Sequence, residues 1–542
     1  MSSNKKTKVL CIFDGFGLAV DSENNCISRA KMPHFRKLLS EYQWSVFNAD
    51  GDSVGQEAGL VGNSEVGHMN IGGLKLVPQL SYQITKSSEN NFDLDKQVSP
   101  DQLFDPKYFL KNTFSKPEKN KTIHLIGLFS TGTIHSDLRH WAAAIVSAGQ
   151  SGAENIVLHI ISDGRDSDKK SLVATWDGFM KTYSEKIKPF EDKILVGSIG
   201  GRFYSMDRDK NLDRVTKGIS SMFYNSVSDV FENISIYDVE SKSYSSEVFD
   251  ENIQPVSITQ NLIVPNDTVW FLNFRTDRMK QMISMICDRN TEYGLNLTMI
   301  SMNDYCVGHE IYLNEKLETT RSKDAVGYFP IFKNQPVQNT LAQTISKEGK
   351  TQLHIAETEK FNHVTYFFNG GQDKKWTGED WVVIPSNKVQ SHAEKPEMKA
   401  KEVTDYILEH GLGKYDYIIV NYANPDMVGH TGDIGAGVTS MEFLDTQLGR
   451  LLEVINGEEY SMILIADHGN MEMVGGYTKD SYELTDTEHN ANPVPCIVID
   501  SNYKTLNLDR DYSVEWLTHK EIEEKKNTQQ ALWTAGKLIL EL

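Results

Sequence analysis

KVLCIFDG, residues 8–15, is a short apolar run that ends abruptly in an aspartate and a glycine. The same design recurs along the chain, where runs rich in β-branched residues stop at polar or turn residues. The further runs are residues 122–130, 155–162, 193–200, 268–274, 417–423 and 462–466. Continuous runs of this length are typical of strands buried on both faces of a parallel sheet.

Amphipathic stretches lie between these runs, for example at residues 398–410 and 442–455. Alternation of strands and helices predicts an α/β fold. Ligands of such sheets bind at the carboxyl ends of the strands. The polar residues that follow the runs are therefore the first candidates for a functional site.

Two segments break the pattern. Residues 87–121 are polar, contain prolines and lysines, and show little periodicity, which predicts a variable surface excursion. Residues 314–336 also lack periodicity and are a candidate linker.

Composition limits the possible functions. The chain has 542 residues, too many for one compact core, so two large domains are expected. The formal net charge of −20 disfavours nucleic acid and anionic membranes as partners. We find no signal peptide and no apolar stretch near the ~20 residues of a membrane helix. The five cysteines are scattered, which fits a reducing compartment and a cytoplasmic location.

Carboxylates and imidazoles follow several of the runs and form a candidate metal-ligand set. An isolated Asp-x-x-x-His or Asp-His pair is weak evidence, but here independent strands bring such residues to one edge. Mixed oxygen and nitrogen ligands suit Zn²⁺ or Mn²⁺ better than Ca²⁺, and two cations can clamp both oxygens of an in-line displacement. The set is Asp14, Asp426, His430, Asp467, His468 and His489.

A candidate nucleophile lies in GLVGNSEVGHMNIGG, residues 59–73. Ser64 stands in a glycine-flanked turn before an expected helix, where the backbone can approach an anion closely. A nearby metal could lower the pKa of its hydroxyl group. The alternative is a simple helix N-cap serine, which is much commoner.

Arginines form a third group within this acidic protein. Their planar forks suit carboxylate or phosphate groups, and each arginine lies just after an expected strand. The alternative is surface pairing with neighbouring aspartates. The group comprises Arg165, Arg202, Arg208, Arg275 and Arg278, with His135, Asp166 and Lys360 as possible acid–base residues.

These motifs together resemble one known family. In chain order they are DGFG, VGNSEVGHMNIG, HSD, DGRD, GRFYSMDRD, NFRTDR, IAETEKFNHVTYFFNGG, NYANPDMVGHTG, ADHGN and HNANPVP. In this order they resemble the cofactor-independent (2,3-bisphosphoglycerate-independent) phosphoglycerate mutases of the alkaline phosphatase superfamily. The family's GGVHSH and DGRDTPP strings are GTIHSD and DGRDSDKK here, with His135, Arg165 and Asp166 retained.

The resemblance implies a particular domain organisation. An alkaline phosphatase-like domain, a mainly parallel sheet flanked by helices, would be assembled from residues 1–76 and 334–542. An inserted α/β transferase domain would span residues 81–327. Residues 77–80 and 328–333 would be hinge crossovers.

The resemblance also implies the cofactors and the nucleophile. Two divalent metal ions are expected, Mn²⁺ first, with Zn²⁺, Co²⁺ or Mg²⁺ as variants, and no 2,3-bisphosphoglycerate. Asp426, His430 and His489 would hold one ion. The other ion would be held by Asp14, Ser64, Asp467 and His468. Ser64 would carry the phosphoryl group while glycerate reorients between two hydroxyl acceptors.

The substrate residues follow from the same resemblance. The glycerate portion would be held by His135, Arg165, Asp166, Arg202 and Arg208, with Asp166 as the candidate general base. The phosphate would be bound by Arg275, Arg278 and Lys360. A monomer that acts on phosphoglycerate in glycolysis or gluconeogenesis is expected.

Three other functions remain open from the sequence. The same metals and serine would serve a phosphomonoesterase if water reached the phosphoserine. A phosphopentomutase belongs to the same superfamily. A non-catalytic binding protein that kept the fold is the third alternative.

Overall fold

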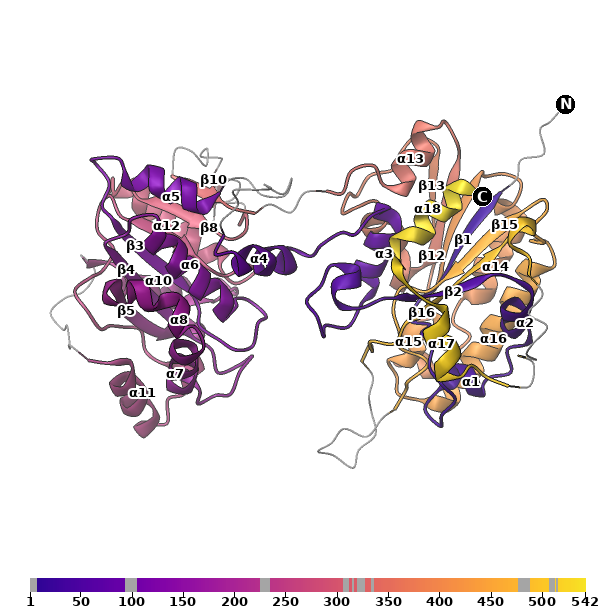
Figure 1. Ribbon diagram of the computed structural model, residues 1–542, viewed down its shortest axis with the longest axis horizontal. Helices are drawn as coiled ribbons and strands as arrows, with labels where there is room; N and C mark the ends of the chain where they lie inside the picture. The colour runs from indigo at the N-terminus through magenta and orange to yellow at the C-terminus, as the bar shows by residue number, and fades with distance from the viewer. Residues whose placement is uncertain are drawn as a thin grey trace. The chain divides into compact units, whose positions relative to one another are not determined.

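The computed structural model describes residues 7–92, 105–224, 234–305, 311–313, 316–318, 327–332, 336–475, 488–505, 512 and 515–542. The chain divides into two compact units. Unit 1 combines Met1–Gln79 with Pro336–Leu542, and unit 2 is Leu80–Gln335. Each unit contains a sheet with helices packed against it (Figure 1).

The sheet of unit 1 has eight strands among the described residues, in the order β13-β12-β14-β1-β15-β16-β2-β17. Strands β13 to β15 in this order are parallel, whereas β16 is antiparallel to both of its neighbours. The strands are β1 (Lys8–Phe13), β2 (Trp44–Asn48), β12 (Gln352–Glu357), β13 (Glu379–Ile384), β14 (Tyr417–Tyr422), β15 (Ser461–Ile465), β16 (Val494–Ile499) and β17 (Lys526–Ala531).

Helices cover this sheet. Two of them are the helices predicted from residues 398–410 and 442–455, which lie in α14 with the turn that follows it and in α16. The helices of unit 1 are α1 (Cys26–Arg29), α2 (Pro33–Glu41), α3 (Ser64–Gly73), α13 (Leu341–Lys347), α14 (Ala400–Tyr406), α15 (Asn424–Gly429), α16 (Ile434–Leu452), α17 (His519–Lys525) and α18 (Trp533–Glu541).

The sheet of unit 2 has seven described strands in the order β11-β8-β7-β3-β4-β5-β6, and only β6 is antiparallel. The strands are β3 (Thr122–Leu128), β4 (Asn155–Ser162), β5 (Ile194–Gly201), β6 (Val256–Ser257), β7 (Thr268–Phe271), β8 (Thr298–Ser301) and β11 (Tyr328–Pro330). A separate antiparallel pair is formed by β9 (Ile311–Leu313) and β10 (Lys316–Glu318).

The helices of unit 2 pack against this sheet and enclose the core that includes Trp141 and Trp270. They are α4 (Leu80–Glu89), α5 (Pro106–Phe114), α6 (Leu138–Gln150), α7 (Leu172–Thr182), α8 (Ser184–Ile187), α9 (Arg202–Ser205), α10 (Leu212–Ser220), α11 (Ile236–Ser245) and α12 (Lys280–Glu292). The α/β fold class with two mainly parallel sheets is therefore confirmed.

The expected surface excursion at residues 87–121 is wrong for residues 106–114, whereas residues 115–121 are mostly exposed. Residues 106–114 form α5, and Leu110 and Phe114 are buried in the core of unit 2 together with Phe92. Aspartate caps this helix, since the Asp105 side chain accepts hydrogen bonds from two backbone N–H groups of its first turn. Residues 93–104 lie outside the described residues.

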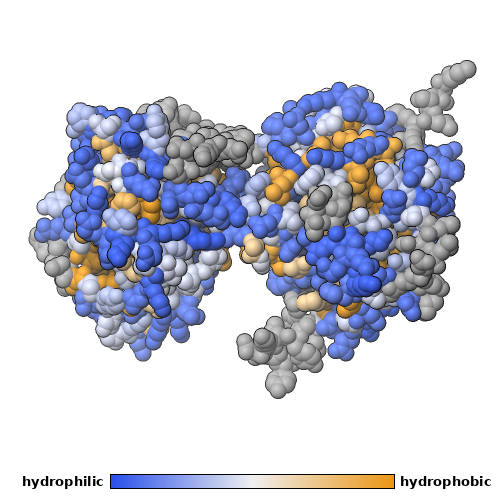
Figure 2. Space-filling model, viewed as in Figure 1, coloured by the Kyte–Doolittle hydropathy of each residue, from blue (hydrophilic) through white to orange (hydrophobic). Residues whose placement is uncertain are grey.

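The expected crossover at residues 328–333 starts later in the chain. Tyr328–Pro330 form β11, which pairs in parallel with β8 and so belongs to the sheet of unit 2. Most of the candidate linker 314–336 lies outside the described residues. No helix in the described part of the chain is long and apolar enough to cross a membrane. The visible face of each unit is largely hydrophilic, with scattered apolar areas (Figure 2).

Candidate functional site

Four neighbouring parallel strands of unit 1 end at one edge of its sheet, and each is followed by a predicted site residue. Asp14 follows β1, and Asp467 and His468 follow β15. Asp426 lies in the first turn of α15 after β14, and Lys360 ends the short 3₁₀ turn after β12. All five side chains are buried. The carboxyl edge of the sheet therefore collects residues from segments that are distant in sequence.

Ser64 is the first residue of α3, and its hydroxyl group faces this edge. The helix cap is Asn63, whose side chain accepts a hydrogen bond from the Val66 N–H group. The hydroxyl group of Ser64 is thus free of a capping role. It lies 3.0 Å from Asp14 Oδ1 and 2.9 Å from His468 Nε2.

Lys360 joins the serine to two carboxylates. Its Nζ lies 2.7 Å from Ser64 Oγ, 2.7 Å from Asp14 Oδ1 and 2.6 Å from Asp426 Oδ2. Burial alone lowers the pKa of Lys360, but the surrounding carboxylates raise it overall. Burial raises the pKa of Asp14 and of Asp426, but the positive charge of Lys360 holds both pKa values well below the ordinary range. The centre consequently combines an ammonium group with ionised carboxylates.

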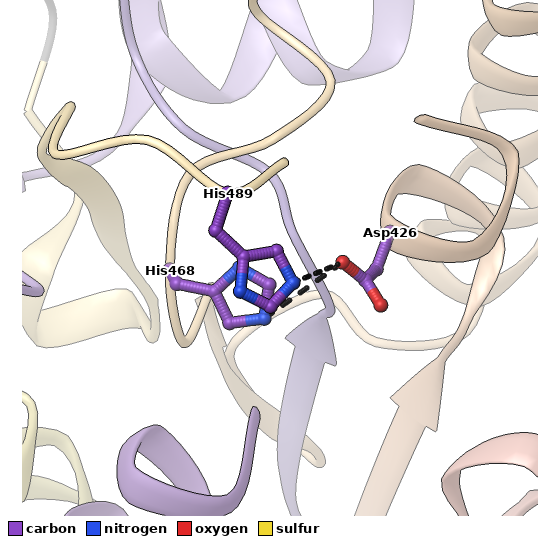
Figure 3. Close-up of side chains that lie close together, drawn as sticks. All are labelled: Asp426, His468 and His489. Atoms are coloured by element: carbon purple, nitrogen blue, oxygen red, sulfur yellow. Dashed lines mark hydrogen bonds and ion pairs between the residues drawn. The ribbon is translucent and has the colours of Figure 1, made fainter. Parts of the chain in front are cut away.

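Three histidines complete this edge. His430 Nε2 and His489 Nε2 each lie 3.1 Å from Asp426 Oδ1. The rings of His468 and His489 lie side by side with centroids 4.0 Å apart, and both face the Asp426 carboxylate (Figure 3). His468 Nε2 is also 3.5 Å from Asp14 and from Asp467. His468 therefore lies between the carboxylates of the two expected ligand sets.

These residues fit divalent cations. Two groups place their potential ligand atoms within 4.8 Å of one another: Asp426 with His468 and His489, and Asp14 with His68 and Asp467. Asp467 Oδ2 is buried and accepts no hydrogen bond from the described residues, although His68 Nδ1 lies 3.1 Å away. A buried anionic oxygen without a hydrogen-bond donor needs a cation to compensate it.

Close packing fixes the positions of the loops at the carboxyl edge of the sheet in unit 1. Two glycines, Gly15 and Gly67, make this packing possible. Gly15 has φ +74°, and a Cβ there would lie 2.8 Å from the backbone of Asp426. Gly67 belongs to α3, and a Cβ there would lie 2.6 Å from Asp467 Cβ. The absence of side chains lets the strand-end loops and α3 approach within van der Waals distance.

A second constellation lies at the carboxyl edge of the sheet in unit 2. Arg202, the first residue of α9, places Nη1 2.6 Å from Asp163 Oδ1 and 2.5 Å from Asp166 Oδ2. Its side chain is 3% exposed, so this is a buried ion pair rather than a surface one. Burial lowers the pKa of Arg202, but the two carboxylates raise it overall. Ser130 donates a hydrogen bond to Asp163 and anchors the loop after β3.

Two of the remaining predicted arginines pair with Asp277, and a third, Arg278, bonds to the backbone of Met206. Arg275 Nε lies 3.2 Å and Arg208 Nη1 3.4 Å from the Asp277 carboxylate, and about half of each arginine side chain is exposed. Arg278 donates to the Met206 carbonyl oxygen, 3.3 Å away. Exposed guanidinium groups around a single carboxylate leave donors free for an anionic ligand.

His135 and Arg165 differ in environment. His135 is buried between Asp166 and Asp277, each 3.8 Å from one ring nitrogen. Burial, followed by Arg202, lowers the pKa of His135 to about 4, so the ring is neutral at pH 7. Arg165 is 56% exposed and 3.5 Å from Glu251. Among the predicted arginines that pair with a carboxylate, Arg165 therefore has the most exposed side chain.

Four residues at these edges were not predicted from the sequence. Asp163 and Asp277 pair with the arginines, and His68 and Asn421 lie behind the carboxylates of unit 1. Two signals were present. His68 follows Ser64 by four residues, which places both on one face of a helix. Asn421 interrupts an otherwise apolar strand run.

Comparison with known proteins gives a consistent assignment. The model of the Metalloenzyme superfamily matches residues 6–535. The 2,3-bisphosphoglycerate-independent phosphoglycerate mutase of Clostridium novyi is 36% identical, and the alignment covers 93% of each chain. That of Metamycoplasma hominis is 37% identical, with 92% of this chain and 93% of the relative covered. The superfamily and the two ligand groups indicate dependence on divalent metal ions.

A solved structure has the same fold. The phosphoglycerate mutase of Leishmania mexicana, determined at low cobalt concentration, aligns with a TM-score of 0.51 and 23% identity. The alignment covers 99% of this chain and 95% of that chain.

Proposed function

This chain belongs to the family of 2,3-bisphosphoglycerate-independent phosphoglycerate mutases, and on that premise we propose that it interconverts 3-phosphoglycerate and 2-phosphoglycerate through a phosphoserine at Ser64. The enzyme is an isomerase that moves a phosphoryl group within one small acid. The observation that carries the proposal is the position of Ser64 Oγ, within 3.0 Å of Asp14, His468 and Lys360.

Two divalent ions are proposed for the edge of unit 1, with Mn²⁺ as the first choice and Zn²⁺, Co²⁺ or Mg²⁺ as alternatives. Asp426, His430 and His489 would hold one ion. The other ion would be held by Asp14, Ser64, Asp467 and His468. Bound there, the ions would supply Lewis acidity toward the phosphoryl oxygens and the serine oxygen.

The chain's own residues then divide the work. Ser64 Oγ, in its deprotonated form, forms a bond to phosphorus while the bond from phosphorus to the glycerate oxygen breaks, and that oxygen takes a proton from Asp166. Lys360, an ammonium group 2.7 Å from Ser64 Oγ, neutralises negative charge that develops beside it. In the second half, the other hydroxyl group of glycerate gives its proton to Asp166 and attacks the phosphoserine, and the serine oxygen leaves as an oxyanion beside Lys360.

The residues of unit 2 are proposed to hold glycerate during its reorientation. Arg202, Arg208 and Arg165 supply forks for its carboxylate, and the neutral His135 ring supplies a hydrogen-bonding nitrogen. Asp166 is proposed as the base that accepts the proton of the attacking hydroxyl group. Arg275 and Arg278 are proposed as phosphate ligands together with Lys360.

We propose that water is kept away from the phosphoserine during turnover, because its hydrolysis would release free phosphate. We propose residues 77–80, the first of the two crossovers between the units, as a hinge. Reversible cross-linking of the units through introduced cysteines should stop turnover until the link is reduced. Full turnover in the cross-linked protein would contradict a hinge.

The decisive experiment measures conversion of 3-phosphoglycerate to 2-phosphoglycerate with Mn²⁺ and without bisphosphoglycerate, before and after chelation. We expect turnover that disappears with chelator and returns with added Mn²⁺. Ser64→Ala should abolish it. Ser40→Ala, which removes a hydroxyl group that donates to the Lys37 carbonyl oxygen outside the site, should not.

The alternatives give different outcomes in the same assay. Free phosphate released at the rate of substrate loss would identify a phosphomonoesterase. Turnover of pentose phosphates without turnover of phosphoglycerate would identify a phosphopentomutase. Equal rates for wild type and Ser64→Ala would refute the serine mechanism altogether.

A cytoplasmic monomer is proposed as the working form. Sedimentation at several protein concentrations should give one species of about the chain mass, 61.3 kDa. Cell fractionation should recover the protein with the cytosol, and recovery with membranes or organelles would contradict the location.

A further inference from the structure

His68 and Asn421 lie next to the carboxylates of Asp14 and Asp467 in unit 1. Both side chains are fully buried. His68 is on α3, one turn after Ser64, and Asn421 is in β14, the strand that pairs with β1. They therefore connect the helix of the nucleophile with the central strands of the sheet.

The partners of Asn421 determine which atoms donate and which accept in its two hydrogen bonds. Asn421 Nδ2 lies 2.6 Å from Asp14 Oδ2 and 2.9 Å from His68 Nε2. The Asp14 carboxylate can only accept, so the amide nitrogen must face it. The second amide hydrogen then points to His68 Nε2, which must be the unprotonated acceptor.

The tautomer of His68 follows from this. With Nε2 accepting, the ring proton is on Nδ1, which lies 2.9 Å from the Ser64 carbonyl oxygen. The same Nδ1 is 3.1 Å from Asp467 Oδ2. One neutral imidazole thus touches the backbone of the nucleophile, one expected metal ligand directly, and a second through Asn421.

His68 could instead be a metal ligand, since it is one of the three residues whose potential ligand atoms cluster with Asp14 and Asp467. The hydrogen bonds argue against this. Nδ1 carries the proton directed to Ser64, and the Nε2 lone pair accepts from Asn421. Neither nitrogen has a lone pair left for a cation.

We propose that His68 and Asn421 are positioning residues that hold Asp14 and the first turn of α3 in place for one of the two metal ions. Asn421 occupies Asp14 Oδ2 and leaves Oδ1, the oxygen 3.0 Å from Ser64 Oγ, directed to the reacting side. His68 fixes the orientation of Asn421 and the first turn of α3. The inference rests on the proposed two-metal function.

The test is a titration of each purified protein with Mn²⁺, followed by calorimetry and by the electron paramagnetic resonance signal of free Mn²⁺. Wild type should bind two ions. Asn421→Leu and His68→Leu should each lower the affinity for one of the two ions about 10–100-fold, which is the usual effect of losing a group that orients a ligand. The affinity for the other ion should not change. Their turnover should recover at high Mn²⁺, which a general folding defect would not allow.

Two further variants separate positioning from structure. His68→Gln keeps an acceptor for Asn421, so its metal affinity should return to within a few-fold of wild type. His354→Leu is the matched control, because His354 is also fully buried in unit 1 and bonds through both nitrogens, to the Val364 carbonyl oxygen and Gln352. It should leave both affinities unchanged even if the protein unfolds more easily.

Several results would overturn the inference. Unchanged affinities in folded Asn421→Leu, or the same weakening in His354→Leu, would show that the pair does not orient the ligands. Loss of one histidine nitrogen coupling from bound Mn²⁺ in His68→Gln would make His68 a ligand. A wild-type protein that binds no Mn²⁺ would instead overturn the two-metal function itself and the inference with it.

Discussion

Gly67 offers the sharpest test of how packing sets the geometry of the serine. A Cβ at this position would lie 2.6 Å from Asp467 Cβ and 2.7 Å from the Asp467 carbonyl oxygen. Carbon atoms pack at about 3.5–4.0 Å, so Gly67→Ala should displace α3 by roughly 1 Å. Ser64 lies one turn earlier on this helix and would move with it.

The expected effects on stability and on rate differ in size. Overpacking costs about 1–3 kcal/mol, and the better helix propensity of alanine offsets about 1 kcal/mol of this cost. The net loss of unfolding free energy should therefore stay below about 2 kcal/mol. The rate should fall about 100-fold, because a 1 Å misplacement of reacting groups has roughly that effect.

The assay pairs urea unfolding with the initial rate of 2-phosphoglycerate formation. Gly178→Ala is the matched control, since Gly178 is an exposed glycine of α7 and a Cβ there would meet no atom within 4 Å. It should stabilise the protein by about 0.5–1 kcal/mol and leave the rate unchanged. A wild-type rate in Gly67→Ala, or an equal loss in Gly178→Ala, would refute the packing argument.

Three further predictions concern charge and metal. Burial raises the pKa of Glu357 from 4.5 to about 7, so the folded protein retains a proton that the unfolded chain releases, and stability should fall by roughly 3 kcal/mol as the pH rises through this window. Glu357→Gln should remove that slope in urea unfolding at pH 5 and pH 8, and a retained slope would contradict the assignment. Arg202→Met should lower the unfolding free energy by about 3–5 kcal/mol, because it leaves Asp163 and Asp166 without their cation. Arg139→Met, at a partly exposed pair, should lower it by about 1 kcal/mol or less. Equal losses would show that burial of the pair is unimportant. Chelation should lower the unfolding free energy by about 2.7 kcal/mol for each ion removed, relative to protein held at 100 times the dissociation constant of each site, with faster hydrogen exchange in unit 1 only; exchange that speeds up equally in both units would place the metal effect elsewhere.

The central strands were predictable because their apolar runs are long and uninterrupted. β1 and β4 coincide with the runs at residues 8–13 and 155–162. The edge of the sheet in unit 1 was harder, since β2 and β17 contain polar residues, as in KNTQQA at Lys526–Ala531. α5 was missed because the polar residues Lys111, Asn112 and Thr113 between its buried Leu110 and Phe114 hide a short apolar face.

The predicted site residues were recognisable from residue type at strand ends and from the order of motifs. The sequence could not show how they group in space. His468 was expected with Asp14 and Asp467, yet the structure places its Nε2 within 4 Å of Asp426 as well. Contacts such as Asn421 with Asp14 depend on strand pairing between segments that are far apart in sequence, and local patterns carry no information about them.

The order of strands in unit 1 has a consequence for biosynthesis. β1 is made first, yet both strands beside it come from the last third of the chain, and its Lys8 is 409 residues from its partner Tyr417. At ~5–20 residues per second, the apolar face of β1 waits roughly 20–80 s on the ribosome before its first neighbour is synthesised. Unit 2 is complete before then, so it can fold while the first segment of unit 1 remains unpaired, and nascent chains should depend on chaperones that shield β1.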